Sequence, residues 1–390
     1  MNISLIIPTL GYSSTVNKLF IALSNQTLLP DEIIIVDSSK DKSISNLADL
    51  FHQELPIKYF KVKDLFPGEA RNYGINKASG NILATLDSKT IPNNNWLELG
   101  VKKIMHENYD IAFGATAYLA ESSLQKILQA CIYGKNVVET LPGSIFWLNT
   151  FNKVGPFIEG TRSGEDLEWR NRVKRKGCRS YSFTTQTQTY NDISTSLVQE
   201  IKRAFIYQLH GAKLDVQERT RIVIFGLGTL MLTLLIPQWN NIVGWEESNL
   251  YIPNITKSYF YFFSIFSILV LILSQKFHSI IRSVYFRFVL FSFFILATFF
   301  VFKWNAAMAS WVEESVYYIP HITKIYVCLL IMSGVIFRGL YMPISKGISY
   351  SYLFPLRWIL VGAVGLIIDL ARFPGYFYGA ITGLIRIGKR

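Results

Sequence analysis

The sequence predicts an α/β domain with a mostly parallel, open sheet, followed by an α-helical transmembrane region. Two observations favour this fold class. In the first half of the 390-residue chain, β-branched runs of strand length alternate with segments that carry apolar residues at helical spacing. After about residue 221, long apolar runs of bilayer-spanning length replace this pattern. Alternating strands and helices imply a sheet that holds ligands at the carboxyl ends of its parallel strands.

Two units of strand, helix and strand follow each other along the first half. The second strand, "DEIIIVDSS", is apolar at nearly every position, as expected where helices cover both faces of a parallel sheet. Gly80 ends the second helix. The predicted strands are residues 3–10, 31–39, 57–62 and 81–87, and the predicted helices are residues 13–26 and 68–79.

Two aspartates follow strands of this sheet. Asp37 and Asp87 both lie where a strand ends, at the edge that is expected to bind ligands. An aspartate just after a strand is also common as a helix cap or turn residue, and for either one alone that role is favoured. Two of them, on two strands of one sheet, favour a ligand site.

Five motifs in order carry a resemblance to a known family. They are "IIPT", "SNQTLLPDEIIIVDSS", "PGEARNYGINKASG", "LDSKTIPNNNWLE" and "GEDLEWRNRVKRKG". In the order and spacing of these motifs, roughly residues 3–180 resemble the GT-A glycosyltransferases of family two. The resemblance implies a GT-A fold and transfer of a sugar from a nucleotide diphosphate donor, with inversion at the anomeric carbon.

The resemblance also implies roles for individual residues. Thr9 and Asp37 would lie against the base and ribose of the donor, and Arg71 near the nucleotide. Asp166 falls on the catalytic base of the family, with Glu165 beside it. The implied nucleotide-sugar site consists of Pro8, Thr9, Asp37, Arg71, Asp87, Ser88 and Lys89.

The acidic pair suits the chemistry of inverting transfer, which needs a carboxylate to take the proton of the attacking acceptor hydroxyl. In "SGEDLEWRNRV", Gly164 allows close approach of the backbone, and the pair opens an apparent helix whose N-terminal dipole keeps carboxylates ionised. The alternative is that Glu165 and Asp166 only cap this helix. Together with the upstream motifs, base catalysis by Asp166 is the preferred hypothesis.

Lys89 is where the sequence departs from the pattern of the family. Asp87 takes the position of the first aspartate of the Asp-x-Asp motif, whereas Lys89 replaces the second carboxylate and would repel a divalent cation. Three interpretations follow. Asp87 and the donor phosphates hold Mg or Mn with other ligands, or the Lys89 ammonium itself neutralises the diphosphate, or Lys89 points to solvent. Metal binding is slightly favoured because Asp87 keeps its place and His210 offers a possible extra ligand.

A basic segment, "RAFIYQLHGAKLD", follows the head and contains two further candidate site residues. His210 is a candidate metal ligand or phosphate contact, and Lys213 a candidate contact to a lipid-linked phosphate. The alternative for the histidine is a structural role, which is commoner for a lone histidine.

The second half of the chain predicts a membrane anchor behind a head of residues 1–198. Residues 199–221 mix apolar and basic side chains at helical spacing, which is typical of an interfacial helix. Residues 222–342 predict two duplicated transmembrane hairpins, because "EESNLYIPNITKSY" from Glu246 is repeated as "EESVYYIPHITKIY" from Glu313.

Charge gives the expected orientation of this anchor. The loop that holds Lys276, Arg282 and Arg287 is basic, whereas the loops on either side carry acidic pairs. The positive-inside rule therefore places the head in the cytoplasm, on an inner or plasma membrane. Residues 343–390 include charges such as Asp369 that are costly in mid-bilayer, so they predict an interfacial or membrane hairpin element.

Bulk composition narrows the partners. A net charge of +12 suits anionic lipid and phosphate-bearing substrates, and nucleic acid is less favoured because part of the charge flanks membrane segments. Cys131, Cys178 and Cys328 lie far apart and indicate ordinary buried thiols. The first residues, "MNISLIIPTL", lack a basic leader and predict a strand and no signal peptide.

These observations predict an inverting membrane glycosyltransferase that moves one sugar to a lipid-linked acceptor. The acceptor would be polyprenyl phosphate or a polyprenyl-diphosphate glycan in surface glycan assembly. One alternative is a processive polysaccharide synthase, which is disfavoured because the Arg357-Trp358 pair lacks the glutamine of a Gln-x-x-Arg-Trp signature. The other is a catalytically inactive membrane scaffold, which the departure at Lys89 favours and the otherwise complete site opposes.

Overall fold

The computed structural model describes residues 2–11, 14–214 and 334–387. Most of the two hairpins predicted over residues 222–342, including both copies of the repeat, lies outside the described residues. So do the last part of the predicted interfacial helix, residues 215–221, and Cys328.

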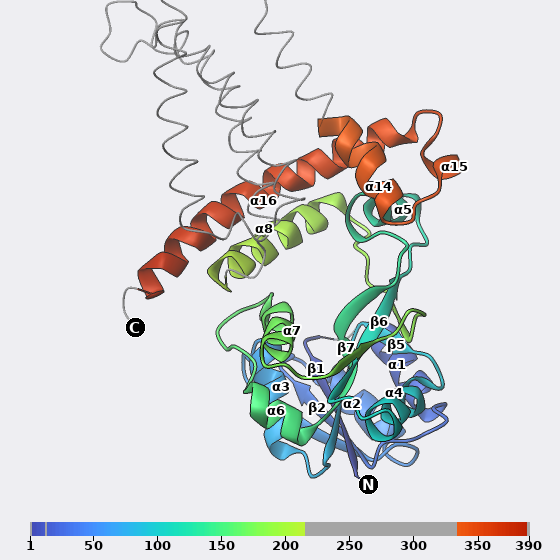
Figure 1. Cartoon of the computed structure of the whole chain (residues 1–390), viewed down its shortest axis with the longest axis vertical. Coiled ribbons are helices and arrows are strands. Elements are labelled where there is room, and N and C mark those ends of the chain that lie inside the picture. The colour runs from blue at the N-terminus through green and yellow to red at the C-terminus, as the bar shows by residue number, and fades with distance from the viewer. Residues whose placement is uncertain (1, 12–13, 215–333, 388–390) are drawn as a thin grey trace, which may run out of the picture. The chain divides into compact units, whose positions relative to one another are not determined.

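One sheet runs through the head, and its first half is parallel as the sequence predicts (Figure 1). The strands of this half lie in the order β3-β2-β1-β4. Each predicted strand is found, with bounds shifted by a few residues at most. The strands are β1 (Ile3–Thr9), β2 (Glu32–Asp37), β3 (Ile57–Lys61) and β4 (Ile82–Thr85).

The second half of the sheet is mixed, which corrects the expectation of a mostly parallel sheet. β7 pairs antiparallel with both β4 and β6, whereas β8 and β9 run parallel to β6. An antiparallel return needs no crossover helix, so no strand-helix alternation announces it in the sequence. The remaining strands are β5 (Thr90–Pro92), β6 (Ile111–Tyr118), β7 (Val138–Trp147), β8 (Ser180–Ser182) and β9 (Gln188–Tyr190).

Helices cover both faces of the sheet, each over its own apolar cluster. α1, α2 and α4 bury their apolar side chains on one face, and α3, α6 and α7 on the other. Both predicted helices are confirmed, as α1 and α3. The bounds are α1 (Ser14–Ser24), α2 (Ser43–Phe51), α3 (Pro67–Lys77), α4 (Trp96–His106), α6 (Leu148–Val154) and α7 (Glu165–Arg175).

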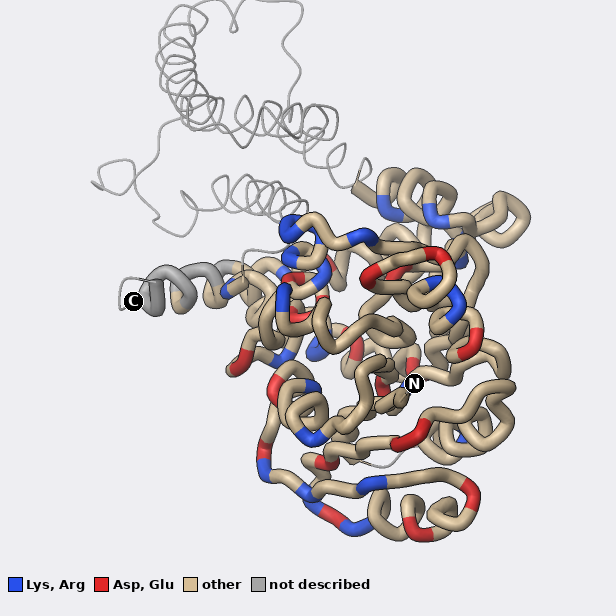
Figure 2. The backbone as a smooth tube through the Cα atoms, turned by 60° about the horizontal axis from the view of Figure 1, so that its bottom comes forward, with Lys and Arg blue, Asp and Glu red and all other residues tan. Residues whose placement is uncertain are grey.

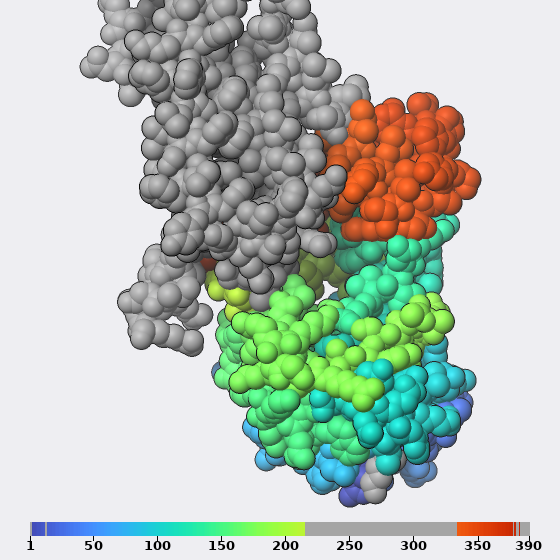
Figure 3. Space-filling model, in the orientation of Figure 1, coloured from blue at the N-terminus to red at the C-terminus, as the bar shows by residue number. Residues whose placement is uncertain are grey.

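The C-terminal residues belong to the same compact unit as the head. The backbone N–H groups of Lys135 and Asn136 donate to the carbonyl oxygen of Lys346, at 2.9 and 3.1 Å. Figure 3 shows atoms of this C-terminal segment (orange) against those of the segment around α5 (teal). The elements here are α5 (Ser123–Leu128), the π-helix η1 (Gln129–Tyr133), the π-helix η2 (Phe337–Tyr341), α14 (Met342–Ser345) and α15 (Tyr350–Leu353).

Two long helices, α8 (Leu197–Leu214) and α16 (Arg357–Ile387), lie side by side in this unit (Figure 1). Their backbones approach closely at two glycines of α16. A Cβ atom on Gly375 would lie 2.5 Å from the carbonyl oxygen of Phe205, and one on Gly379 would lie 2.2 Å from that of Leu209. Any larger residue at these positions would therefore push the two helices apart.

α16 is one continuous helix, so residues 357–387 do not form a hairpin. It carries few charges (Figure 2), and its acidic residue is neutralised within the protein. Asp369 is buried and pairs with Arg338 at 2.8 Å and with Arg372 at 3.1 Å. Among the described helices, the stretch Arg357–Tyr376 alone has the length and apolar composition of a membrane span, which by itself is weak evidence for one.

Candidate active site

The predicted nucleotide site gathers at the carboxyl ends of three neighbouring parallel strands. Thr9 ends β1 and pairs in register with Asp37, which ends β2. The Thr9 hydroxyl donates to Asp37 Oδ1 at 3.1 Å. Asp87 follows the adjacent strand β4, and the half-buried Pro8 precedes Thr9. The register of the parallel strands therefore brings these residues to one edge of the sheet.

Asp37 is fully buried, and its two oxygens accept hydrogen bonds from several donors. The Tyr59 hydroxyl lies 2.7 Å and the Lys61 ammonium 3.0 Å from Asp37 Oδ2, while Ser39 donates to Oδ1. Burial favours the neutral acid, but the hydrogen bonds of Ser39, Tyr59 and Lys61 outweigh it and hold the pKa of Asp37 below its ordinary value. Asp37 is therefore a fixed anion at the strand ends.

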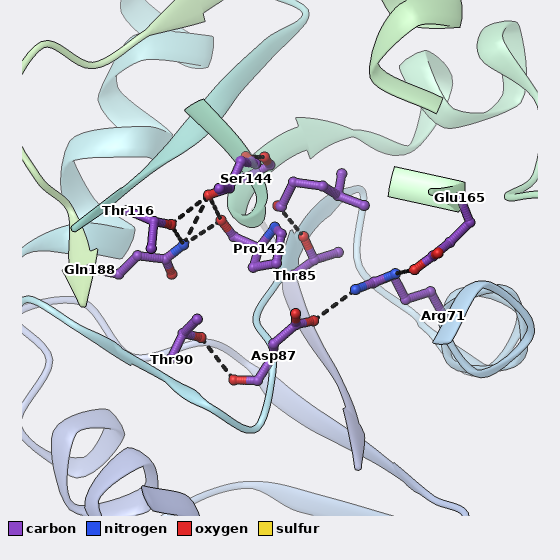
Figure 4. Close-up of polar contacts among 11 residues, drawn as sticks. Arg71, Thr85, Asp87, Thr90, Thr116, Pro142, Ser144, Glu165 and Gln188 are labelled. Carbon is purple, nitrogen blue, oxygen red and sulfur yellow. Dashed lines mark hydrogen bonds and ion pairs between the residues drawn. The ribbon is translucent and has the colours of Figure 1, made fainter. Parts of the chain in front are cut away.

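Arg71 joins two acidic positions that lie far apart in the sequence (Figure 4). Its Nη2 lies 2.7 Å from Asp87 Oδ1, and its Nη1 lies 2.9 Å from Glu165 Oε1. The Arg71 side chain is 3% exposed. Burial disfavours its charge, yet the carboxylates of Asp87, Glu165 and Asp166 raise the pKa of Arg71. This guanidinium connects the end of β4 to the start of α7.

The two members of the acidic pair differ in their surroundings. α7 starts after Gly164, whose φ of 89° is a left-handed value that favours glycine. Glu165 points inward to Arg71, and burial together with the charge of Asp166 raises the pKa of Glu165. Asp166 is half-buried, and within the described part of the chain its carboxylate has no hydrogen bond or ion pair. Of the two, Asp166 is thus the one whose carboxylate has no partner within the described residues.

Lys89 has a carboxylate partner that the sequence analysis did not identify. Its ammonium pairs with Asp192 Oδ2, which Arg203 Nη2 also contacts at 3.2 Å. Asp192 follows β9, which is antiparallel to the strand that begins at Thr90. In the sequence, the available signal was an acidic residue two positions after the end of a short strand. Lys89 therefore does not simply point to solvent, and Ser88 lies half-buried in the turn before it.

The described residues do not form a metal site by themselves. They contain no group of three His, Cys, Asp or Glu side chains placed to share an ion. Asp87 has its Oδ1 on Arg71, and its side chain is 36% exposed, so its second oxygen can serve as one ligand. A magnesium ion typically has one or two protein carboxylates and completes its shell with phosphate oxygens and water. The site fits a cation that arrives with the donor.

His210 contacts the loop that precedes the acidic pair. Its Nδ1 accepts a hydrogen bond from the backbone N–H of Arg162 at 3.2 Å, and its ring lies 5.9 Å from that of Phe66. Burial and the positive charges of Lys213 and Arg162 lower the pKa of His210. These cationic surroundings do not suit a metal ligand.

Comparison with known proteins finds similarity to glycosyltransferases. The model of the family described as "Glycosyl transferase family 2" matches residues 4–161. Glycosyltransferase AglE of Haloferax volcanii is 28% identical over 198 residues, which cover 47% of this chain and 63% of AglE. An uncharacterized glycosyltransferase of Rickettsia bellii is 30% identical over 174 residues, which cover 42% of this chain and 25% of that protein. The chain thus spans less than two thirds of the length of these curated relatives.

Among solved structures, that of S. aureus TarS, residues 1–349, in complex with UDP-GlcNAc matches with a TM-score of 0.44 at 14% sequence identity. The match covers 93% of this chain and 91% of that chain.

Proposed function

We propose that the protein is an inverting glycosyltransferase, a proposal supported by the match of residues 4–161 to the model of the family described as "Glycosyl transferase family 2". It moves one sugar from a nucleotide diphosphate sugar to a lipid-linked acceptor, polyprenyl phosphate or a polyprenyl-diphosphate glycan. The donor class is supported by relatives that are named glycosyltransferases. A lipid-linked acceptor is supported by the apolar runs of residues 222–342.

The observation that carries this proposal is the contrast between Glu165 and Asp166. Arg71 holds Glu165 inside the protein, while Asp166 is left without a partner among the described residues, one position further along α7. A general base needs an accessible, ionised carboxylate that is fixed in direction. The buried Glu165 anchors the first turn of α7 and so fixes the position of Asp166.

The reaction then proceeds as a single displacement. The acceptor oxygen attacks the anomeric carbon and forms the new glycosidic bond, while the bond from that carbon to the diphosphate oxygen breaks. The proton of the attacking glycan hydroxyl, or of a singly ionised acceptor phosphate, passes to the Asp166 carboxylate, and the nucleoside diphosphate leaves with the bonding electron pair. Attack from the side opposite the leaving group inverts the anomeric configuration.

Charge balance supports a divalent cation, Mg²⁺ or Mn²⁺, with Asp87 as its protein ligand. Even when Glu165, whose pKa is raised, is left out of the count, Asp87 and Asp166 outnumber the guanidinium of Arg71. Lys89 does not make up the deficit, because Asp192 already neutralises it. Such an ion, when bound, would neutralise the negative charge of the diphosphate. The residues of the chain provide the remaining functions: they orient the donor and accept the proton.

The test is a transfer assay of the full-length protein in membranes, with a panel of nucleotide sugars and with polyprenyl phosphate as acceptor. We expect one donor to be consumed with release of nucleoside diphosphate, and Asp166→Asn to abolish the release. Near-normal turnover by Asp166→Asn contradicts the assigned base. The size of the product separates single transfer from processive synthesis, because a synthase gives a ladder of products.

The head is proposed to face the cytoplasm, on an inner or plasma membrane. The basic loop that holds Lys276, Arg282 and Arg287 supports this orientation.

A further inference from the structure

A cluster of basic groups lies beside the base loop, which we define as residues 159–164 leading into α7. The loop is tied to α8 by two hydrogen bonds. The Ser163 hydroxyl donates to the carbonyl oxygen of Tyr207 at 2.9 Å, and the backbone N–H of Arg162 donates to His210 Nδ1 at 3.2 Å. These bonds place one face of α8 directly against the loop that carries the acidic pair.

The hydrogen bond to His210 determines its tautomer. Because Nδ1 accepts a hydrogen bond, the ring proton of the neutral imidazole is on Nε2. Burial and the charges of Lys213 and Arg162 lower the pKa of His210, so the ring is neutral at pH 7. Its Nε2–H has no hydrogen-bond partner among the residues that the structure describes. The ring thus offers one hydrogen-bond donor, Nε2–H, next to the positive charges of Arg162 and Lys213.

Within the described residues, the two cations have no carboxylate partner. Neither Arg162 nor Lys213 forms an ion pair with any carboxylate within residues 2–11, 14–214 and 334–387. Nearby basic residues of α7 and α8 behave differently. Arg170 pairs with Glu139, Arg172 with Glu168, and Arg203 with Asp192 and Glu200.

This cluster continues into an apolar surface on the same face of α8. Tyr207, His210 and Lys213 are spaced by three residues, and Ile206 precedes His210 by four, so all four share one face. Ile206 and Tyr207 are 43% and 46% exposed. A ligand with an anionic head and an apolar tail fits this order of side chains.

We propose that Arg162, His210 and Lys213 bind the phosphate group of the acceptor, with its hydrocarbon chain along the exposed apolar face of α8. The inference rests on the proposed function and adds the acceptor subsite to it. The donor residues Thr9 and Asp37 lie at the strand ends, whereas this cluster adjoins the residues that precede Asp166. A phosphate bound here would hold the acceptor on the side of the catalytic base.

Binding of farnesyl phosphate to the full-length protein in nanodiscs tests this subsite without requiring turnover. We expect farnesyl phosphate to bind at least about tenfold more tightly than farnesol, since a charge-assisted hydrogen bond is worth about 1.5–3 kcal/mol. Arg162→Gln and Lys213→Gln should each weaken farnesyl phosphate about tenfold and leave farnesol unchanged. Lys176→Gln removes an exposed charge at the far end of α7 and should change neither affinity.

Two further binding measurements, with UDP and with inorganic phosphate, identify the source of the phosphate. The variant His210→Asn tests the Nε2–H group as a hydrogen-bond donor to the phosphate. UDP should bind all variants equally, and inorganic phosphate should compete only weakly. If Arg162→Gln weakens UDP and not farnesyl phosphate, the cluster serves the donor and the proposal is wrong. If inorganic phosphate binds as tightly as farnesyl phosphate, a lipid acceptor is excluded as the specific ligand.

The variant His210→Asn keeps a hydrogen-bond acceptor for the Arg162 N–H but loses the Nε2–H group. It should therefore weaken the binding of farnesyl phosphate while the melting temperature is kept. A failed base assignment would show instead as turnover by Asp166→Asn, with these affinities unaffected.

Discussion

Replacing Lys89 by alanine tests how the charge of the leaving diphosphate is neutralised. The Lys89 side chain is 42% exposed and its partner Asp192 31% exposed. Ion pairs with this much solvent contact are worth about 0.2–1 kcal/mol. If the Lys89 ammonium only forms the ion pair with Asp192 and does not contact the diphosphate, Lys89→Ala should change kcat/KM for the sugar donor by no more than about fivefold. Asp87→Asn should cost about a hundredfold or more, because it removes the carboxylate proposed as the protein ligand of the metal.

The assay is release of nucleoside diphosphate, measured with saturating Mg²⁺ and with chelator, followed by addition of Mg²⁺ or Mn²⁺. Chelator should abolish release by wild type and by Lys89→Ala alike, and the metals should restore it. Lys102→Ala is the matched control, because it breaks an exposed pair with Glu98 on α4. Release that survives chelator in wild type and is lost in Lys89→Ala would refute the reasoning and assign the countercharge to the ammonium.

Three further outcomes follow from the site. Asp166→Asn should lower kcat by about 10²–10⁴-fold and leave the Kd of UDP unchanged, as measured by calorimetry. Arg71→Met leaves Glu165 buried without its cation and should destabilise the head by about 3–5 kcal/mol in thermal unfolding, with Arg71→Lys intermediate. Because the pKa of His210 is lowered in the folded state, the stability tied to its neutral form is present above about pH 6.5 and is lost as pH falls through the folded pKa. The melting temperature should therefore drop less between pH 7 and pH 5 in His210→Asn than in wild type.

The parallel half of the sheet could be predicted because its signals are local. Strands such as Glu32–Asp37 are apolar at every position, and the helices between them show helical spacing. The same locality explains the placement of Asp37 and Asp87, since the end of a strand is visible in the sequence. The mixed half is set by pairings between distant strands, such as β4 with β7, and periodicity carries no information about partners.

The contacts that give the site its electrostatics could not be predicted for the same reason. Arg71 meets Glu165 across 94 positions of sequence, and Lys89 meets Asp192 across 103. Lys89 and Asp87 are two residues apart in the sequence, so their charges were expected to act on the same ligand. In the structure, Asp87 pairs with Arg71 and Lys89 pairs with Asp192. The sequence did not predict that residues 337–387 pack in the same unit as the head. An apolar composition predicts that a segment is buried or lies in a membrane, but it does not specify the surface against which the segment packs.

α8 links these separate observations into one arrangement. Through Arg203 it contacts Asp192, the partner of Lys89 on the proposed donor side. Through Tyr207 and His210 it holds the base loop on the proposed acceptor side. The position of α8 itself depends on α16, whose glycines allow contact with the α8 backbone. Since the two sides of the site share this one helix, a residue that forces α8 away from α16 would disturb donor and acceptor contacts together. The C-terminal helix is therefore part of the structure that positions the reacting groups, although it lies more than a hundred residues beyond the head in the sequence.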